Sequence, residues 1–117
     1  MMTRKEIEEY LMSMPGAWLD YPFGEDVSVY KVGHKDAGEE EHMFALISND
    51  LTPLRVSLKC DPQLAELLRE RYETIVPGYH LSKKHWNTII CTGQVPDDEI
   101  KDFIRHSYHL VTDQVAT

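Results

Sequence analysis

The sequence has little of what characterises secreted, disulfide-stabilised or membrane-spanning proteins. Its 117 residues include two cysteines, Cys60 and Cys91, which do not form a Cys-x-x-Cys pair. This excludes a disulfide framework and favours two thiols that serve packing. No apolar run approaches the roughly 18 residues that cross a bilayer. Residues 1–9 carry acids where a secretory signal carries an apolar segment. We therefore expect a cytoplasmic protein.

Catalytic and cofactor motifs are also lacking. The sequence has no Gly-x-Ser-x-Gly, phosphate-binding loop, His-Glu-x-x-His or Gly-rich dinucleotide fingerprint. Ser82 lies near His80, but its position before a short helical turn predicts a capping role for its hydroxyl. His106, His109 and Asp102 have helical spacing, although two surface histidines and an acid often occur together by chance. We therefore expect a non-enzymatic protein without cofactor or metal.

Positive charge is scarce, and it is unevenly distributed. The chain carries 12 basic and 20 acidic side chains, a net charge of −8, which argues against a general affinity for nucleic acid. Residues 51–92, however, carry 6 basic and 4 acidic side chains, a local charge of +2. This middle part of the chain is therefore the candidate for an anion-binding surface.

Apolar periodicity and turn residues predict the secondary structure. Thr3 and Glu6 form a capping box that begins a helix ending at Pro15-Gly16. Asp61-Pro62 and Asp97 are typical starts of two further helices. Short apolar or alternating segments predict strands around residues 27–32, 43–47, 54–58 and 88–91.

The element order predicts an α+β fold. The connections between the strands are short and require hairpins, so the sheet is expected to be mainly antiparallel. We expect the N- and C-terminal helices to pack on one face of this sheet, in a single domain over residues 1–117. The predicted single core contains Ile7, Leu11, Leu46, Leu58, Leu67, Phe103 and Ile104.

Several segments together resemble the MmcQ/YjbR family of small bacterial proteins. The resemblance spans nearly the whole chain and is most specific in the segment from Pro77 to Thr88. It is carried by residues 15–17, 21–24, 31–33, 43–47, 56–62, 77–88, 107–108 and 110–111. The resemblance implies a frataxin-like, double-wing fold and a DNA-binding function. The acidic loop after Gly33 and the histidine at position 109 depart from the family pattern.

A basic segment around a tryptophan is the densest polar constellation. Lysine and arginine hold phosphate by charge, and an indole can stack on a base. The candidate binding residues are Lys31, Arg55, Lys59, His80, Lys83, Lys84, Trp86 and Asn87. The sequence leaves two alternatives for the partner: DNA, bound weakly and in a salt-sensitive manner, or a small anion or protein bound by the same surface. Trp86 and His80 can equally be structural, with the indole in the core.

Overall fold

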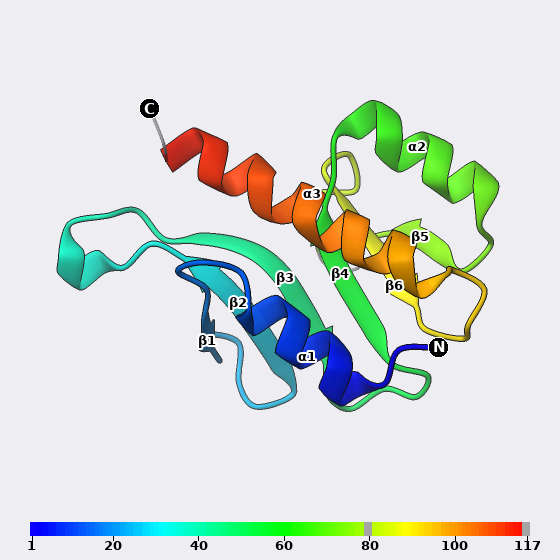
Figure 1. Cartoon of the computed structure of the whole chain (residues 1–117), viewed down its shortest axis with the longest axis horizontal. Helices are drawn as coiled ribbons and strands as arrows, with labels where there is room; N and C mark the ends of the chain where they lie inside the picture. The colour runs from blue at the N-terminus through cyan, green and yellow to red at the C-terminus, as the bar shows by residue number, and fades with distance from the viewer. Residues whose placement is uncertain (79–80, 116–117) are drawn as a thin grey trace.

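In the part of the chain that the structure describes, six strands form one antiparallel sheet, and three α-helices pack on one of its faces (Figure 1). The structure is a computed structural model that describes residues 1–78 and 81–115. The strand order is β1-β2-β3-β4-β6-β5. The elements are α1 (Arg4–Met12), β1 (Trp18–Asp20), β2 (Val27–Val32), η1 (Lys35–Ala37), β3 (His42–Ser48), β4 (Arg55–Lys59), α2 (Pro62–Arg71), β5 (Ile75–Pro77), β6 (Trp86–Ile90) and α3 (Asp97–Val115). The predicted α+β class and the antiparallel sheet are confirmed.

The predicted starts of α1 and α2 are confirmed in their hydrogen bonds. The Glu6 backbone N–H donates to Thr3 Oγ1 at 3.2 Å, and the Thr3 N–H donates to the Glu6 carboxylate at 3.0 Å. Asp61 Oδ2 accepts from the N–H groups of Gln63 and Leu64. These local bonds satisfy backbone donors that the first helical turn leaves free. They explain why both starts could be predicted from sequence.

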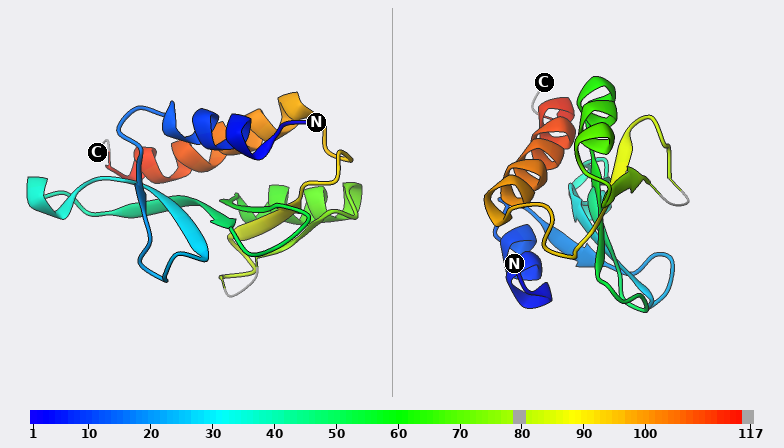
Figure 2. Two further views of the ribbon diagram at one scale, coloured as in Figure 1. Left: turned by 90° about the horizontal axis from the view of Figure 1, so that it is seen from below. Right: turned by 90° about the vertical axis from the view of Figure 1, so that its right-hand side faces the viewer.

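The main core lies between the sheet and the helices. It contains Ile7 and Leu11 of α1, Ile104 of α3 and Leu58 of β4, as predicted. Phe103 is partly buried against this core rather than inside it. Figure 2 shows α1 and α3 side by side on the same side of the sheet.

Two predicted core residues were placed wrongly. Leu67 is 61% exposed, because α2 turns Ala65 and Leu68 toward the sheet and successive helical residues point about 100° apart. A small alanine therefore takes the buried position that the prediction gave to a leucine. Leu46 is buried, but on the opposite face of the sheet, with Val29 and Trp86. The predicted single core is in fact two.

A buried hydroxyl ties α3 to the middle of the sheet. Ser107 is fully buried, and its Oγ donates to the Phe44 carbonyl at 2.5 Å and accepts from the Lys59 N–H at 2.9 Å. Phe44 and Lys59 come one residue beyond the last paired residues of β3 and β4, Ala45 and Leu58. The serine hydroxyl thus bridges two strands where their ladder ends and satisfies a buried donor and a buried acceptor.

The opposite face of the sheet bears only a small apolar cluster. Val29, Leu46 and Trp86 are buried there, and Val27, Met43 and Leu81 pack around them. None of the helices in the described part of the chain lies on this face (Figure 2). We call it the outer face. Loops and side chains, rather than a second layer, define its shape.

Replacing Ser107 with alanine should lower the free energy of unfolding by about 1–3 kcal/mol, because two buried backbone groups lose their partner. Urea unfolding followed by circular dichroism measures this. Thr112→Ala is the matched control, because its hydroxyl bonds to the Tyr108 carbonyl within the same helix. Equal stability of the two variants would contradict the bridging role of Ser107.

Candidate binding groove on the outer face of the sheet

Four neighbouring strands form the floor of a groove on the outer face. In the sheet, Leu46 pairs with Ser57 and Ser57 pairs with Thr88, so these side chains form one row. Ser48 pairs with both Val27 and Arg55 in a parallel row. Because side chains two residues apart point to the same face, both rows face away from the helices.

Three loops build apolar walls around this floor. Phe23 comes from the β1–β2 loop, Leu51 from the β3–β4 loop and Leu81 from the β5–β6 loop. Phe23 is 61% exposed and Leu51 is 40% exposed, so both side chains present apolar surface to solvent at the groove. The groove encloses about 410 Å³, within the range of roughly 300–1,000 Å³ that is typical of small-molecule sites.

Arg55 supplies the positive charge of the groove. Its Nε is the one buried side-chain nitrogen or oxygen in the described residues that makes no hydrogen bond. Arg55 also forms no ion pair with any other described residue. A buried donor without a partner is costly, and in native proteins such groups usually have a ligand, water or functional role.

Hydroxyl and carboxylate groups complete the polar lining. Ser57 Oγ and Thr88 Oγ1 are hydrogen-bonded to each other at 2.8 Å on the floor. Each hydroxyl has further lone pairs beyond this bond. Asp26 and Asp50 lie at the rim, so the described residues that line the groove include one basic and two acidic ones.

Trp86 supports the groove from below instead of facing solvent. It is only 7% exposed and packs with Leu46 and Leu81, both of which line the groove. The backbone of Gly78 lies so close that a Cβ on it would be 2.7 Å from the Trp86 Cβ. The position directly after β5 therefore needs a glycine, and the indole is not available to stack on a base.

Lys31, another predicted binding residue, is committed to ion pairs. It is 8% exposed, and its Nζ lies 2.9 Å from Asp20 Oδ2 and 3.5 Å from Glu41 Oε2. Burial alone would lower the pKa of Lys31, but the hydrogen bond and charge of Asp20, with Glu41, outweigh this and raise it. The same bond, with the N–H of Tyr21, lowers the pKa of Asp20.

The other predicted residues do not converge on one site. Lys59 lies four residues from Arg55 on β4, about 13 Å along the strand. Lys83 and Lys84 are exposed in the loop before β6. Asn87 faces the helices, where its Oδ1 accepts from Arg69 Nε at 2.7 Å and its Nδ2 donates to the Ala65 carbonyl. His80 lies outside the described residues.

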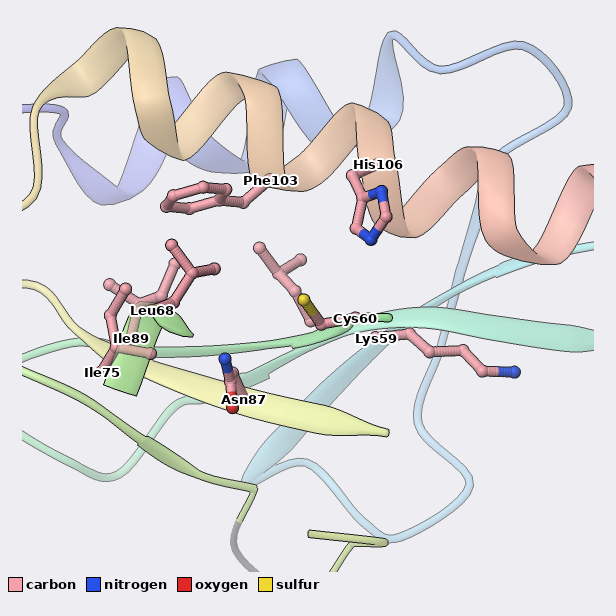
Figure 3. Close-up of a pocket in the computed structure, with 9 residues that line it drawn as sticks. Lys59, Cys60, Leu68, Ile75, Asn87, Ile89, Phe103 and His106 are labelled. Atoms are coloured by element: carbon pink, nitrogen blue, oxygen red, sulfur yellow. The ribbon is translucent and has the colours of Figure 1, made fainter. Parts of the chain in front are cut away.

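A second cavity, between the sheet and the helices, is part of the core. It encloses about 10 Å³, which leaves room for at most one water. Figure 3 shows Cys60, Phe103 and His106 around it. Burial raises the pKa of Cys60 to about 11, as expected for a packing thiol. His106 Nε2 accepts from the Asp61 N–H at 3.1 Å.

The described residues form neither a metal-binding cluster nor a membrane-spanning helix. No group of three or more histidine, cysteine, aspartate or glutamate side chains there could hold a metal ion. No helix in that part of the chain combines the length and apolarity needed to cross a membrane.

Comparison with known proteins places this arrangement in a family. The YjbR family model matches residues 12–110. The chain belongs to the YjbR family. It is 35% identical to the YjbR protein of Escherichia coli K12 over 92% of this chain and 85% of that protein. It is 30% identical to the YyaQ protein of Bacillus subtilis over 94% of this chain and 98% of that protein. Both relatives are described as uncharacterized proteins.

Solved structures agree with the fold of this YjbR-family chain. A crystal structure of a Deinococcus radiodurans protein with a DUF419 domain has a TM-score of 0.87 and 38% identity, covering 96% of this chain and 80% of that one. A Pseudomonas syringae protein has a TM-score of 0.75 and 26% identity, covering 93% of this chain and 98% of that one. The resemblance inferred from the sequence motifs is thus confirmed for family and fold.

Sequence reasoning missed most of the groove in this YjbR-family chain. Of the predicted binding residues, Arg55 lies in it. The missed lining residues are Phe23, Asp26, Val27, Leu46, Ser48, Asp50, Leu51, Ser57, Leu81 and Thr88. One signal was available, because the outward alternation of Arg55, Ser57 and Lys59 marks a sheet face that meets solvent or ligand.

Trp86→Ala should lower the free energy of unfolding by about 3–5 kcal/mol, because it removes the largest side chain of the apolar cluster on the outer face. Thermal and urea unfolding measure this loss. The neighbouring exposed residue gives the control: Lys84→Ala should change the stability by no more than about 0.5 kcal/mol. A Trp86→Ala variant as stable as wild type would mean that the indole does not hold this face together.

The substitution Asp20→Asn should make the free energy of unfolding depend less on pH in the acidic range. The pKa of Asp20 lies below its ordinary value of 3.8 in the folded chain, so its carboxylate stabilises the fold above that pH and loses this effect as the pH falls. The stability difference between wild type and variant should be positive near pH 6 and should shrink as the pH falls through the lowered pKa of Asp20. Urea unfolding at several pH values measures it. A difference that is constant with pH would contradict the ion pair with Lys31.

Proposed function

We propose that this YjbR-family chain is a non-enzymatic binding module that holds a small ligand with an anionic group in the outer-face groove. The observation that carries this proposal is the buried Arg55 Nε without a hydrogen-bond partner, on the floor of a groove of about 410 Å³. A ligand carboxylate that pairs with the Arg55 guanidinium would supply a charge-assisted bond, which is about twice as strong as a neutral one.

The shape of the groove also favours a small molecule. Ligand sites are mostly apolar concavities with a few well-placed polar groups. Here Phe23, Leu51 and Leu81 supply the apolar walls, and the Ser57–Thr88 hydroxyl pair lies beside them on the floor. The apolar part of a small ligand would cover the exposed surfaces of Phe23 and Leu51, and this removal of apolar surface from water would favour binding.

DNA, the partner implied by the family resemblance, finds less support in this arrangement. Lys31 is committed to acids, and Trp86 is buried. Lys59, Lys83 and Lys84 are left as phosphate contacts, and about three contacts give a log–log salt slope near −2.7. Asp26 and Asp50 at the groove would repel a phosphate backbone, as would the net charge of −8.

A binding role without catalysis accords with the cysteines. Burial raises the pKa of both Cys60 and Cys91 to about 11, so each thiol stays protonated at neutral pH. A protonated thiol is a poor nucleophile. The groove itself is lined by neither cysteine nor histidine among the described residues.

An NMR titration tests the proposal through the Arg55 Nε–H signal. The probe is 3-phenylpropanoate, which joins an apolar ring to a carboxylate. The control is its uncharged amide, 3-phenylpropanamide. We expect the carboxylate to shift this signal at concentrations up to about 10 mM, the range of weak fragment binding. The amide should shift it far less. The variant Arg55→Gln should lose the binding, whereas Arg71→Gln, which changes an exposed arginine of α2, should keep it.

Two outcomes would overturn this proposal. One is an Arg55 Nε–H signal that neither compound moves, or that the amide moves equally. The other is tight binding of a labelled DNA duplex in fluorescence anisotropy that Lys83→Glu with Lys84→Glu abolishes and Arg55→Gln leaves intact. That result would instead support the DNA-binding function through the lysine loop.

A further inference from the structure

The outer-face groove contains opposite charges that do not neutralise each other. Arg55, Asp26 and Asp50 all line it. Among the ion pairs formed by described residues, none joins Arg55 to either acid within 4.0 Å, and neither acid is paired elsewhere. Acids and a base that share a groove without pairing leave both charges available to a ligand.

Backbone contacts hold the two acids at the same end of the groove. The Asn49 N–H donates to the Asp26 carbonyl at 2.7 Å, so the residue before Asp50 is fixed beside Asp26. The Asn49 side chain adds bonds to the Glu25 carbonyl and to Ser28 Oγ, each at 2.9 Å. The rim that carries both carboxylates is therefore built by specific bonds between two loops.

Arg55 faces this acidic rim across one strand. Ser48 of β3 pairs with Val27, the neighbour of Asp26, on one side and with Arg55 on the other. Strands lie about 4.8 Å apart, so the backbones of Val27 and Arg55 are about 10 Å from each other. The side chains of Arg55 and the aspartates extend from backbones this far apart, which leaves room between them for an ammonium and a carboxylate on one carbon.

The charge balance selects the ligand class. A purely anionic ligand gains from Arg55 but is repelled by two aspartates, and a purely cationic ligand has the reverse difficulty with Arg55. A molecule with one ammonium and one carboxylate finds an opposite charge in the groove for each of these groups. The apolar walls of Phe23, Leu51 and Leu81 then require an apolar body on the same molecule.

We infer that the groove binds a free α-amino acid with a large apolar side chain. Its carboxylate accepts from Arg55, its ammonium donates to Asp26 and Asp50, and its side chain lies against Phe23 and Leu51. This inference rests on the proposed function, because it takes the anionic group at Arg55 as given. It adds the ammonium site and the chemical class of the ligand.

The test compares three compounds with the same aromatic ring. L-phenylalanine carries both charges, 3-phenylpropanoate lacks the ammonium, and 2-phenylethylamine lacks the carboxylate. Amide chemical-shift titrations of the full chain give their affinities. We expect phenylalanine to bind about three- to five-fold more tightly than 3-phenylpropanoate, the scale of a partly exposed ion pair. The amine should also bind less tightly than phenylalanine, because it cannot pair with Arg55.

Variants of the acids locate the ammonium. Asp26→Asn combined with Asp50→Asn should weaken phenylalanine binding to the level of 3-phenylpropanoate, and should leave the binding of 3-phenylpropanoate equal or tighter. Asp26 accepts from Asn49 through its backbone carbonyl, so the rim keeps its bond in this variant. Asp36→Asn, an exposed acid in η1, is the matched control and should change neither affinity.

The outcomes separate the inference from the function on which it rests. Equal affinities for phenylalanine and 3-phenylpropanoate, unaffected by the aspartate variants, would overturn the amino-acid ligand and leave the anion site at Arg55 standing. If neither phenylalanine nor 3-phenylpropanoate shifts a groove signal, and the amide spectrum is that of a folded chain, both the amino-acid ligand and the anion site at Arg55 would be overturned.

Discussion

One buried hydroxyl connects the helix layer to the middle of the sheet. Ser107 donates to the Phe44 carbonyl and accepts from the Lys59 N–H, so it joins α3 to β3 and β4 at the point where their ladder ends. Because Ile104 and Val111 pack on either side of it along α3, the longest helix is fixed over the central strands. α1 and α2 then complete the same layer.

The outer face follows from this one-sided packing. With the helices on one side, the other side keeps a small core of Val29, Leu46 and Trp86, and the loops around it hold Phe23 and Leu51 exposed. A second layer of helices would have filled the space that Arg55 borders. The groove is therefore a consequence of the fold, and its chemistry is set by a few side chains on β4 and the loops.

Local signals were read correctly from the sequence, and contacts between distant segments were not. The capping box of Thr3 and Glu6 and the Asp61 cap depend on neighbours within three residues, so their patterns suffice. The three-residue strands β1 and β5 were missed, because such short strands depend on pairing with β2 and β6. The ion pairs of Lys31 and the burial of Asn87 likewise depend on partners elsewhere in the chain. Arg55 was identified because strand alternation marked its face, but its groove required the loops.

A crystal structure of the chain grown with 3-phenylpropanoate tests the central claim most directly. The binding site proposed at Arg55 predicts the carboxylate on the outer face, with an oxygen about 2.7–2.9 Å from a guanidinium nitrogen of Arg55, the distance of a charge-assisted hydrogen bond. The ring should lie between Phe23 and Leu51. A compound found only beside Lys83 and Lys84, or a groove closed by its own side chains with Arg55 Nε bonded to protein, would contradict it.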